Sequence, residues 1–515
     1  MQSAAAARGV TETGSSPFSE AGLRSLLVSV AAFSMLLPAL LALTVLPTAM
    51  SDTRESIAWG RAWPLVTPKH PPLMTWVANL VDRSLGPSAA ASIVANQALL
   101  AVGIVYLYAT LRLMTDRCSA LLIAFLFATS IYVVGAPLSY ALNADILQLT
   151  SWPAIVYHFL SAARSNQVKH WLALSAWSAA ALLTKYNAGV LFLGMAVAVV
   201  YIGEFRGLLT NPRLYGAGLV ALVLVSPHAL ALRTHAEPIK YAGHLLGYEP
   251  FGLITLDSFG GLLFGYLFFL APGWIFLLIG FFRRDLAFKS PATADHISSP
   301  GSLRFVVVMN IAMLLLLSGL ILSGLRFIYR FDAPYLAMAV LALGPLVKIN
   351  EDGVDLLSWR IAVSSAIVNL ALFAGAVVMY GLLTNHDRMQ EPTSEAAAAI
   401  LADWNARYAC GPRYFIGEPP SVYGIADVAS PQAIGLITLV VPIVSWFDRQ
   451  SLDDMGAVVV YRGPVEVDAV EAAIPRAQLT AESTMTLPLL RTLTGKTITY
   501  HYRFIPPQHC PAKAP

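Results

Sequence analysis

The chain of 515 residues is too apolar for a soluble globular protein. Hydrophobic residues make up 57% of it and charged residues only 12%, with a mean hydropathy of +0.64, whereas ordinary globular domains carry about a quarter charged residues. The formal net charge of +3 comes from scattered basic residues and excludes a nucleic-acid partner. Composition therefore indicates a membrane protein.

Apolar runs of membrane-spanning length recur over the first three quarters of the chain, and a helix needs about twenty residues to cross the bilayer. A polar segment, 1–25, precedes the first run, which exceeds a signal-peptide core and is interpreted as a retained span. The predicted spans are 26–48, 90–110, 119–135, 147–163, 171–183, 187–203, 215–232, 258–281, 305–323, 334–348 and 361–383, and the short pair 171–183 and 187–203 is alternatively one long tilted helix. The predicted fold is mostly α: a polytopic membrane protein with about eleven transmembrane helices.

Lys and Arg in the loops favour a cytoplasmic N-terminal segment, 1–25. An odd number of spans then places the outer loop 51–89 and the C-terminal domain 384–515 outside the cytoplasm, on either side of a transmembrane domain, 26–383.

The C-terminal domain lacks spanning runs and is typical of a small α/β domain. It is predicted to have a helix over 395–408 and strands over 456–461 and 496–504. Cys410 and Cys510 both lie in it. They pair if the domain faces an oxidising compartment, and the alternative is two free thiols.

The outer loop carries Trp59 and Trp63, which suit an amphipathic helix lying in the membrane interface. Such a loop would hold a lipid-borne substrate at the membrane surface. Asp52, followed by Glu55, has two interpretations: an N-cap with its acidic partner, or a carboxylate that accepts a proton from an attacking hydroxyl.

Four further positions combine charge with membrane depth. Asp145 has two interpretations. It is an N-cap, a role that Asn143 could fill instead, or it is a carboxylate that faces a polar cavity. Lys185 is a loop lysine reaching the interface, or a cation that binds a phosphate. Arg326 and Arg330 would share one face of a helix, either as interface anchors or as a phosphate clamp.

Seven ordered segments together resemble the membrane glycosyltransferases of the C superfamily. They are Asp52 after the first span, Lys69-His70-Pro71-Pro72-Leu73 with Trp76, Asp145, Leu183-Thr184-Lys185-Tyr186, Ser226-Pro227-His228, Pro238-Ile239-Lys240-Tyr241, and Arg326 to Tyr335. The resemblance is to the protein mannosyltransferase and lipid A aminoarabinose transferase group, glycosyltransferase families 39 and 83. The chain departs from it at Asp52-Thr53, where the family commonly has Asp-Glu, so that Glu55 replaces the second acid or the acid is missing.

The resemblance implies an inverting enzyme that moves a sugar from a polyprenyl-phosphate donor to a glycolipid of the lipid A or lipopolysaccharide type, on the periplasmic side of the bacterial inner membrane. Asp52 is then the general base, or orients substrate if the acceptor is an ionised phosphate, and Asp145 positions the sugar or acceptor. Substrate is bound by Glu55, Lys69, His70, Lys185, Tyr186, Arg326 and Arg330. The cations among these residues would stabilise the leaving phosphate.

No metal site or cofactor is predicted, although a divalent ion at Asp52 and Asp145 is an open alternative. Three other functions compete with transfer to a lipid: protein O-mannosylation, transport, and a scaffold without activity. Transporters usually consist of two related halves, and the sequence contains no such repeat.

Overall fold

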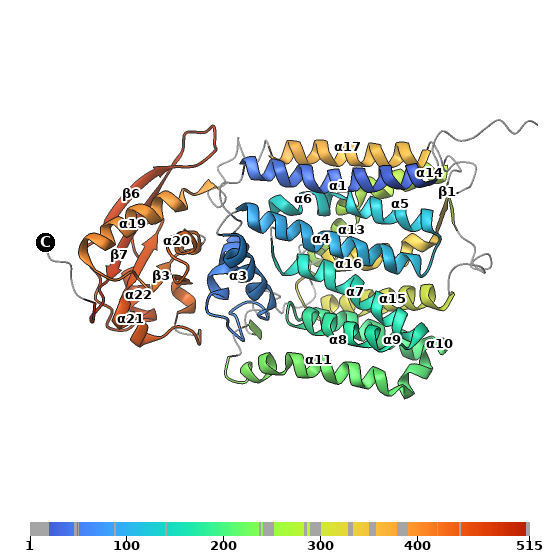
Figure 1. The fold of residues 1–515 in the computed structure, drawn as a ribbon, viewed down its shortest axis with the longest axis horizontal. Coiled ribbons are helices and arrows are strands. Elements are labelled where there is room, and N and C mark those ends of the chain that lie inside the picture. The colour runs from blue at the N-terminus through green and yellow to red at the C-terminus, as the bar shows by residue number, and fades with distance from the viewer. Residues whose placement is uncertain are drawn as a thin grey trace, which may run out of the picture.

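The computed structural model shows a bundle of helices followed by a smaller α/β domain (Figure 1). The residues it describes are 20–45, 49, 51–86, 89–139, 142–235, 238–239, 252–282, 286–288, 300–327, 333–349, 357–377, 390–419, 421–441 and 444–510. The predicted fold class, mostly α with a small C-terminal α/β domain, is confirmed. The predicted boundary at residue 384 lies outside the described residues.

Most helices of the bundle run along one long axis (Figure 1). The described helices of the bundle are α1 (Glu20–Val45), α4 (Ala89–Arg112), α5 (Arg117–Ala128), α6 (Ile131–Ser139), α7 (Ala144–Ser165), α8 (Val168–Leu182), α9 (Ala188–Tyr201), α10 (Gly203–Arg206), η1 (Gly207–Thr210), α11 (Pro212–Ala231), α13 (Leu253–Phe269), α14 (Ala271–Phe282), α15 (Pro300–Leu322), α16 (Ala333–Leu343), η4 (Gly344–Leu346) and α17 (Leu357–Val377). At the end away from the C-terminal domain, β1 (Leu286–Phe288) pairs antiparallel with β2 (Val347–Ile349).

Within the described residues, α4, α11 and most of α15 are long and apolar enough to cross a membrane alone. Helix α9, taken together with α10 and η1, forms a fourth candidate span, with a bend of 104° between α9 and the segment Gly203–Thr210. Shorter apolar helices cover parts of the segments from α5 to α6, α13, α16 and α17. The count of about eleven spans stays a prediction.

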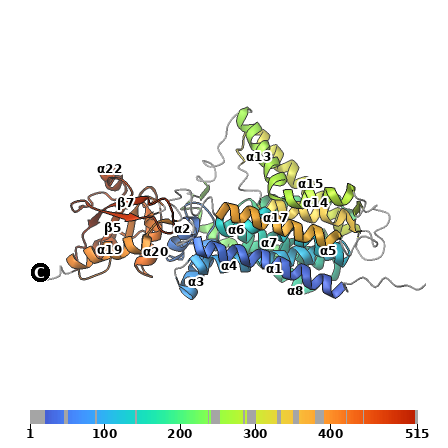
Figure 2. The same cartoon turned by 90° about the horizontal axis from the view of Figure 1, so that it is seen from above.

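Two predicted spans are each divided into two helices. The span over 119–135 breaks after Ala128, where the Thr129 hydroxyl donates to the carbonyl of Phe125 at 3.0 Å. The span over 258–281 breaks at Leu270, two residues before Pro272 in the first turn of α14. Proline fits a first helical turn but not a helix interior. Helix α13 leans away from the bundle while α14 lies along it (Figure 2), so the segment over 258–281 consists of two helices.

Helix α7 is the centre of the bundle, and side chains around its whole circumference are buried. Its Trp152 meets Tyr335 of α16 edge to face, with ring centroids 5.2 Å apart. Helix α4 approaches α7 closely at Gly103, where a Cβ would lie 2.8 Å from the Leu149 carbonyl oxygen. Small residues allow such approach between membrane helices.

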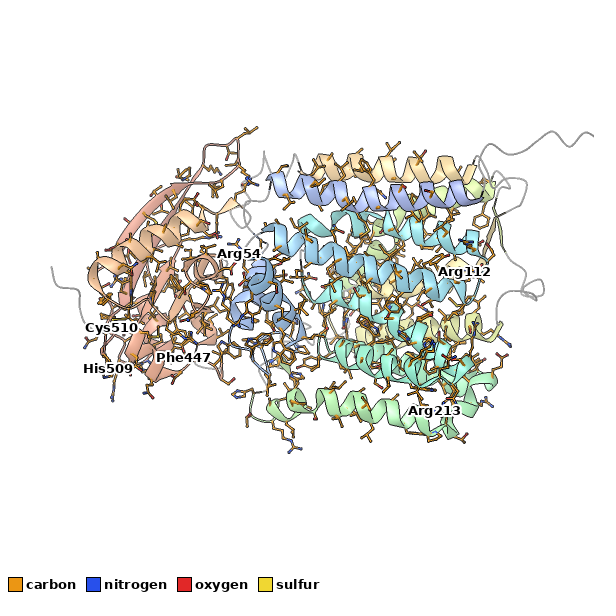
Figure 3. The ribbon with its side chains drawn as sticks, viewed as in Figure 1. Arg54, Arg112, Arg213, Phe447, His509 and Cys510 are labelled. Carbon is orange, nitrogen blue, oxygen red and sulfur yellow. A yellow bond between two sulfur atoms is a disulfide. The ribbon has the colours of Figure 1, made fainter. Side chains whose placement is uncertain are left out.

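The C-terminal domain contains one five-stranded sheet in the order β4-β3-β5-β7-β6, in which β3, β4 and β5 are parallel. Its elements are α19 (Thr393–Arg407), β3 (Tyr414–Gly417), α20 (Ser421–Ala429), β4 (Ile434–Ile437), η7 (Thr438–Val440), α21 (Arg449–Met455), β5 (Ala457–Tyr461), α22 (Val467–Ala473), β6 (Ser483–Pro488) and β7 (Thr497–Ile505). The predicted helix and both predicted strands are confirmed. A disulfide joins Cys410 to Cys510, so the paired alternative holds and not the two free thiols. Figure 3 shows Cys510 on the side of the domain that faces away from the helical bundle.

The outer loop forms two helices, α2 (Ser51–Gly60) and α3 (Leu73–Leu85), which lie between the bundle and the C-terminal domain (Figures 1 and 2). Helix α2 packs against α20 and β4 of that domain. The outer loop and the C-terminal domain therefore lie on the same side of the bundle. If α1 crosses the membrane, this arrangement requires an odd number of crossings.

Candidate active site

The two outer-loop helices are packed tightly against each other. At Gly60 an added Cβ would lie 2.2 Å from the Thr75 carbonyl oxygen, so only glycine allows this approach. Between the helices, the Trp76 indole donates to the Pro64 carbonyl at 2.9 Å. The Thr67 hydroxyl donates to the His70 carbonyl at 2.6 Å and accepts from the His70 amide at 3.1 Å. These bonds fix the segment that carries Lys69 and His70.

Glu55 and Lys69 form an ion pair within the outer loop, with Lys69 Nζ 2.6 Å from Glu55 Oε2. The Lys69 ammonium also lies over the Trp59 ring, 5.8 Å from its centroid. Burial raises the pKa of Glu55 to about 7, although Lys69 opposes the shift. Glu55 is therefore a carboxyl group able to exchange a proton near neutral pH.

Asp52 lies in the first turn of α2, which begins at Ser51, and its side chain is exposed. The interpretation of Asp52 as an N-cap preceding the helix is therefore wrong, and Glu55 binds Lys69 instead of closing a capping box. The charge of Asp52 contributes to the raised pKa of Glu55, so the two carboxyl groups are close enough to interact.

The predicted interfacial helix is also wrong for Trp59, which is buried in a cluster with residues of the C-terminal domain. Its ring meets Tyr423 edge to face, with centroids 6.1 Å apart. Trp63 follows α2 with a left-handed backbone and is exposed. Arg83 lies over the Trp63 ring, 5.7 Å from its centroid.

Asp145 and Lys185 are brought together from segments 40 residues apart, with Lys185 Nζ donating to Asp145 Oδ1 at 2.7 Å. The Lys185 side chain is 14% exposed and the Asp145 side chain 12%, so the pair is largely shielded from solvent. Asn143, not Asp145, is the N-cap of α7, because its side chain accepts from the amides of Asp145 and Ile146. Asp145 is therefore available for its bond with Lys185.

The turn that carries Lys185 is tied to the outer loop. The Leu73 amide donates to the Leu183 carbonyl at 2.9 Å, which links the start of α3 to the end of α8. On the other side of Lys185, the Asn187 side chain accepts from Gln148 of α7. The two ion pairs, Glu55–Lys69 and Asp145–Lys185, are thus held on one connected framework.

His70 lies near both lysines of these pairs. Burial, with the charges of Lys185 and Lys69, lowers the pKa of His70 to about 3. The imidazole is therefore neutral near pH 7. His70 was predicted to be one of the cations that face a phosphate. Because it is neutral, it supplies a hydrogen-bonding group there and no charge.

Tyr186 contacts a residue whose part in the site was not predicted. His228 of α11 has its Nδ1 2.7 Å from the Leu65 carbonyl, and its Nε2 3.1 Å from the Tyr186 hydroxyl. Because a carbonyl only accepts, Nδ1 donates to Leu65 and Nε2 accepts from Tyr186. His228 therefore connects α11, the outer loop and the Lys185 turn. The sequence signal was its place in Ser226-Pro227-His228, one of the segments that carry the family resemblance.

Arg326 is exposed and follows α15 in a segment that is not helical. Arg330 lies outside the described residues. The helix that would give Arg326 and Arg330 a shared face is therefore absent at Arg326, and their role as interface anchors or as a phosphate clamp stays a prediction. In the part of the chain that the structure describes, no group of three or more His, Cys, Asp or Glu side chains is placed to hold a metal ion. A divalent ion at Asp52 and Asp145 stays a hypothesis.

Two lysines, each paired with a carboxylate, thus lie beside a neutral histidine where the bundle meets the outer loop. Cations of this kind can bind an anionic group and stabilise charge that develops on it. A carboxyl group with a pKa near neutrality can take up a proton at the same place. The fold and this cluster together are typical of a membrane-embedded group-transfer enzyme.

Comparison with known proteins supports this class. Residues 69–230 match the family described as dolichyl-phosphate-mannose-protein mannosyltransferase. This stretch contains Lys69, His70, Asp145, Lys185 and Tyr186 but not Asp52. A search of curated proteins by sequence gave no match.

Among solved structures, ArnT from Cupriavidus metallidurans bound to undecaprenyl phosphate is similar over 94% of this chain and 98% of its own, with 14% identity and a TM-score of 0.57. The oligosaccharyltransferase AglB from Archaeoglobus fulgidus has 12% identity, with 80% of this chain and 65% of its own covered, and a TM-score of 0.41. Arabinofuranosyltransferase AftD from Mycobacteria has 14% identity, with 93% of this chain and 41% of its own covered, and a TM-score of 0.45. The chain has an ArnT-like fold, and its resemblance to the C-superfamily membrane glycosyltransferases is confirmed.

Proposed function

We propose that the protein is an inverting glycosyltransferase that moves a hexose or pentose from a polyprenyl-phosphate donor to an envelope glycolipid of the lipid A or lipopolysaccharide type. The observation that carries the proposal is the meeting of Lys69 and Lys185 with Glu55 and Asp145 at one end of the bundle. The match over residues 69–230 and the ArnT-like fold support it. The reaction takes place on the periplasmic face of the bacterial inner membrane.

The donor phosphate binds beside Lys69 and Lys185, and Arg326 and Arg330 contribute further positive charge. The acceptor oxygen attacks the anomeric carbon of the sugar from the side opposite the phosphate. The new carbon–oxygen bond forms as the bond from carbon to phosphate oxygen breaks, and the electron pair leaves with the polyprenyl phosphate. The lysines stabilise the charge on that leaving group. Attack from the opposite side inverts the configuration of the carbon.

The fate of the acceptor proton depends on the acceptor. A hydroxyl must lose its proton, and Asp52, exposed at the start of α2, is the proposed acceptor of it. Glu55, whose pKa is about 7, lies one helical turn after Asp52. It contributes to substrate binding by holding the Lys69 ammonium in place. An ionised phosphate acceptor has no proton to lose, and Asp52 then orients the substrate. Asp145, His70 and Tyr186 position the sugar or acceptor.

Protein O-mannosylation is the second candidate function. One observation favours it: the family matched over residues 69–230 is described as a protein mannosyltransferase. The chain carries Asp52-Thr53 where that group commonly has Asp-Glu. This departure ranks protein acceptors below lipids.

Mass spectrometry of envelope glycolipids tests the proposal. Cells with and without the gene are compared, after complementation with the wild-type gene or with Asp52→Asn. We expect one sugar mass to disappear from a lipid without the gene and to return only with the wild-type gene. An unchanged lipid profile, with loss of a sugar from secreted proteins, would support protein O-mannosylation instead.

A further inference from the structure

Helix α2 packs against the C-terminal domain, and two arginines of the outer loop take part in this contact. Arg54, Ala58 and Arg61 are spaced by four and three residues, so they share one side of the helix and of the turn after it. All three are buried. Two buried arginines, one in α2 and one directly after it, are costly unless their charges are paired or hydrogen-bonded.

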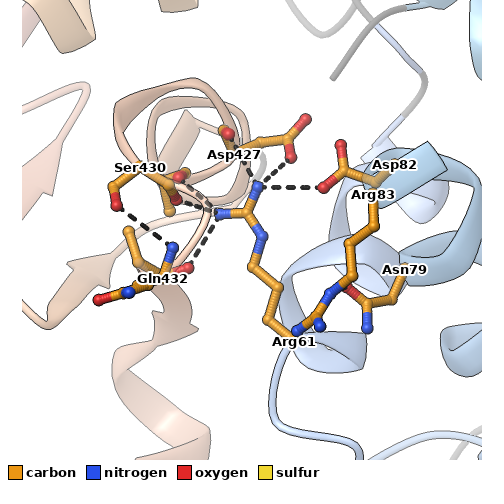
Figure 4. Close-up of polar contacts among 9 residues, drawn as sticks. Arg61, Asn79, Asp82, Arg83, Asp427, Ser430 and Gln432 are labelled. Carbon is orange, nitrogen blue, oxygen red and sulfur yellow. Dashed lines mark hydrogen bonds and ion pairs between the residues drawn. The ribbon is translucent and has the colours of Figure 1, made fainter. Parts of the chain in front are cut away.

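Arg61 is met by the end of helix α20 (Figure 4). Its Nη1 donates to the carbonyls of Ala426, Ser430 and Ala433 at 2.8 to 2.9 Å. Its Nη2 donates to the carbonyl and carboxylate of Asp427, both at 2.8 Å. The last carbonyls of a helix have no partner within it and carry partial negative charge. Arg61 therefore caps α20 from outside the C-terminal domain.

The same guanidinium reaches back to α3, where Nη2 lies 3.3 Å from Asp82 Oδ2. Arg61 thus joins the end of α2 to α3 and to the C-terminal domain with one planar group. A guanidinium has five donors in a fixed geometry, whereas an ammonium has three on a single atom. Lysine cannot reproduce this set of contacts.

Arg54 makes the second connection, with Nη1 3.4 Å from Glu391 Oε2 and side chains 2% and 0% exposed. Glu391 also accepts from Ser421 at 2.9 Å and from Arg462. Arg54 fits only because residue 424 of α20 is glycine: a Cβ there would lie 2.1 Å from Arg54 Nη1. Figure 3 places Arg54 where the C-terminal domain meets the outer loop.

We infer that Arg61 is a positioning residue for transfer: by fixing α2 to the C-terminal domain, it sets where Asp52 and Glu55 stand relative to the donor. The inference rests on the proposed function. Asp52 and Glu55 belong to a helix of only ten residues, so a tilt at its Arg61 end moves both carboxyl groups together. A displacement of about 1 Å in a reacting group can cost on the order of 100-fold in rate.

The test uses Arg61→Lys in the full-length protein, with Arg491→Ala as the matched control. Arg491 also joins the C-terminal domain to the bundle, donating to the Leu43 carbonyl at 2.7 Å, but it is exposed and far from α2 in sequence. Transfer rates are measured against pH, and hydrogen–deuterium exchange is measured over residues 51–60. Gly424→Ala is a second lesion between α2 and α20, at the contact with Arg54, in a helix that alanine favours over glycine.

We expect Arg61→Lys to lower kcat by about 10- to 100-fold and to speed exchange over residues 51–60. The part of the acid limb of its pH–rate profile that Glu55 sets should move to lower pH. Water around a loosened α2 removes the burial that raises the pKa of Glu55, which is a larger effect than the opposing charge of Lys69 or the added charge of Asp52. Gly424→Ala should act in the same direction, and Arg491→Ala should change none of the three quantities. A loss of protein stability alone would scale the profile down without moving it.

Wild-type kcat and exchange in Arg61→Lys and Gly424→Ala would overturn the inference. A lower kcat with an unmoved pH profile and unchanged exchange would also overturn it. If the wild-type protein transfers no sugar, the proposed function fails instead, and exchange over residues 51–60 alone decides whether Arg61 fixes α2.

Discussion

Removing the charge of Lys185 should abolish most transfer. Its ammonium is 2.7 Å from Asp145 and its side chain is 14% exposed, which corresponds to an effective dielectric constant of about 20 rather than that of water. At that value a unit charge about 4 Å away interacts by about 4 kcal/mol. Asp145 already uses part of this attraction, so the gain on the leaving phosphate is smaller. Loss of one such stabilising group in other enzymes lowers kcat by about 100- to 1000-fold.

The variant is Lys185→Met, which keeps most of the apolar stem, and the matched control is Lys169→Met, at an exposed lysine near the start of α8. The assay follows sugar transfer from a polyprenyl-phosphate donor with purified protein. If Lys185 stabilises the departing phosphate, kcat and kcat/KM fall together, whereas a lysine that only binds the donor raises KM and leaves kcat unchanged. Folded Lys185→Met protein with the kcat of the wild type would refute the reasoning.

Two predictions concern stability. The Cys410–Cys510 disulfide joins residues that are 100 positions apart in the sequence, and its removal should destabilise the C-terminal domain by about 2–5 kcal/mol. The double variant Cys410→Ser/Cys510→Ser should therefore unfold at a lower Tm than the wild type, and an unchanged Tm would contradict this. Burial raises the pKa of Asp427 from 3.8 to about 7, against the opposing charges of Arg61 and Arg54 and with the added effect of Asp82. Its ionisation therefore costs stability as pH rises through about 7. Between about pH 6 and pH 8 the wild type should lose more thermal stability than Asp427→Asn, and equal losses would show that Asp427 does not titrate there.

The sequence predicts helices well where hydropathy is continuous and fails where the chain bends inside an apolar run. Helix α4 spans Ala89–Arg112 where 90–110 was predicted, because polar and basic residues mark its ends. The break at Leu270 falls within a run of aromatic and aliphatic residues, so hydropathy gives no sign of it. Helix α1 begins at Glu20, six residues before the predicted start, because a helix extends beyond its apolar part.

The candidate site was predictable residue by residue but not as a set of contacts. Lys185 and Asp145 stand out because charge is costly near the membrane, yet their pairing depends on how α7 packs beside the turn after α8. Arg54 and Arg61 have no such signal. They belong to a polar loop in which arginine is ordinary, and their partners in the C-terminal domain follow more than 330 residues later.

That separation has a consequence for how the protein is made. Residues 51–86 leave the ribosome long before residues 391–433, whose carbonyls and carboxylates receive Arg54 and Arg61. Until the last quarter of the chain is synthesised and reaches the same side of the membrane, both arginines lack those partners. The outer loop therefore cannot acquire its final packing during synthesis of the bundle, and any chain interrupted before Glu391 would carry an unfinished active site.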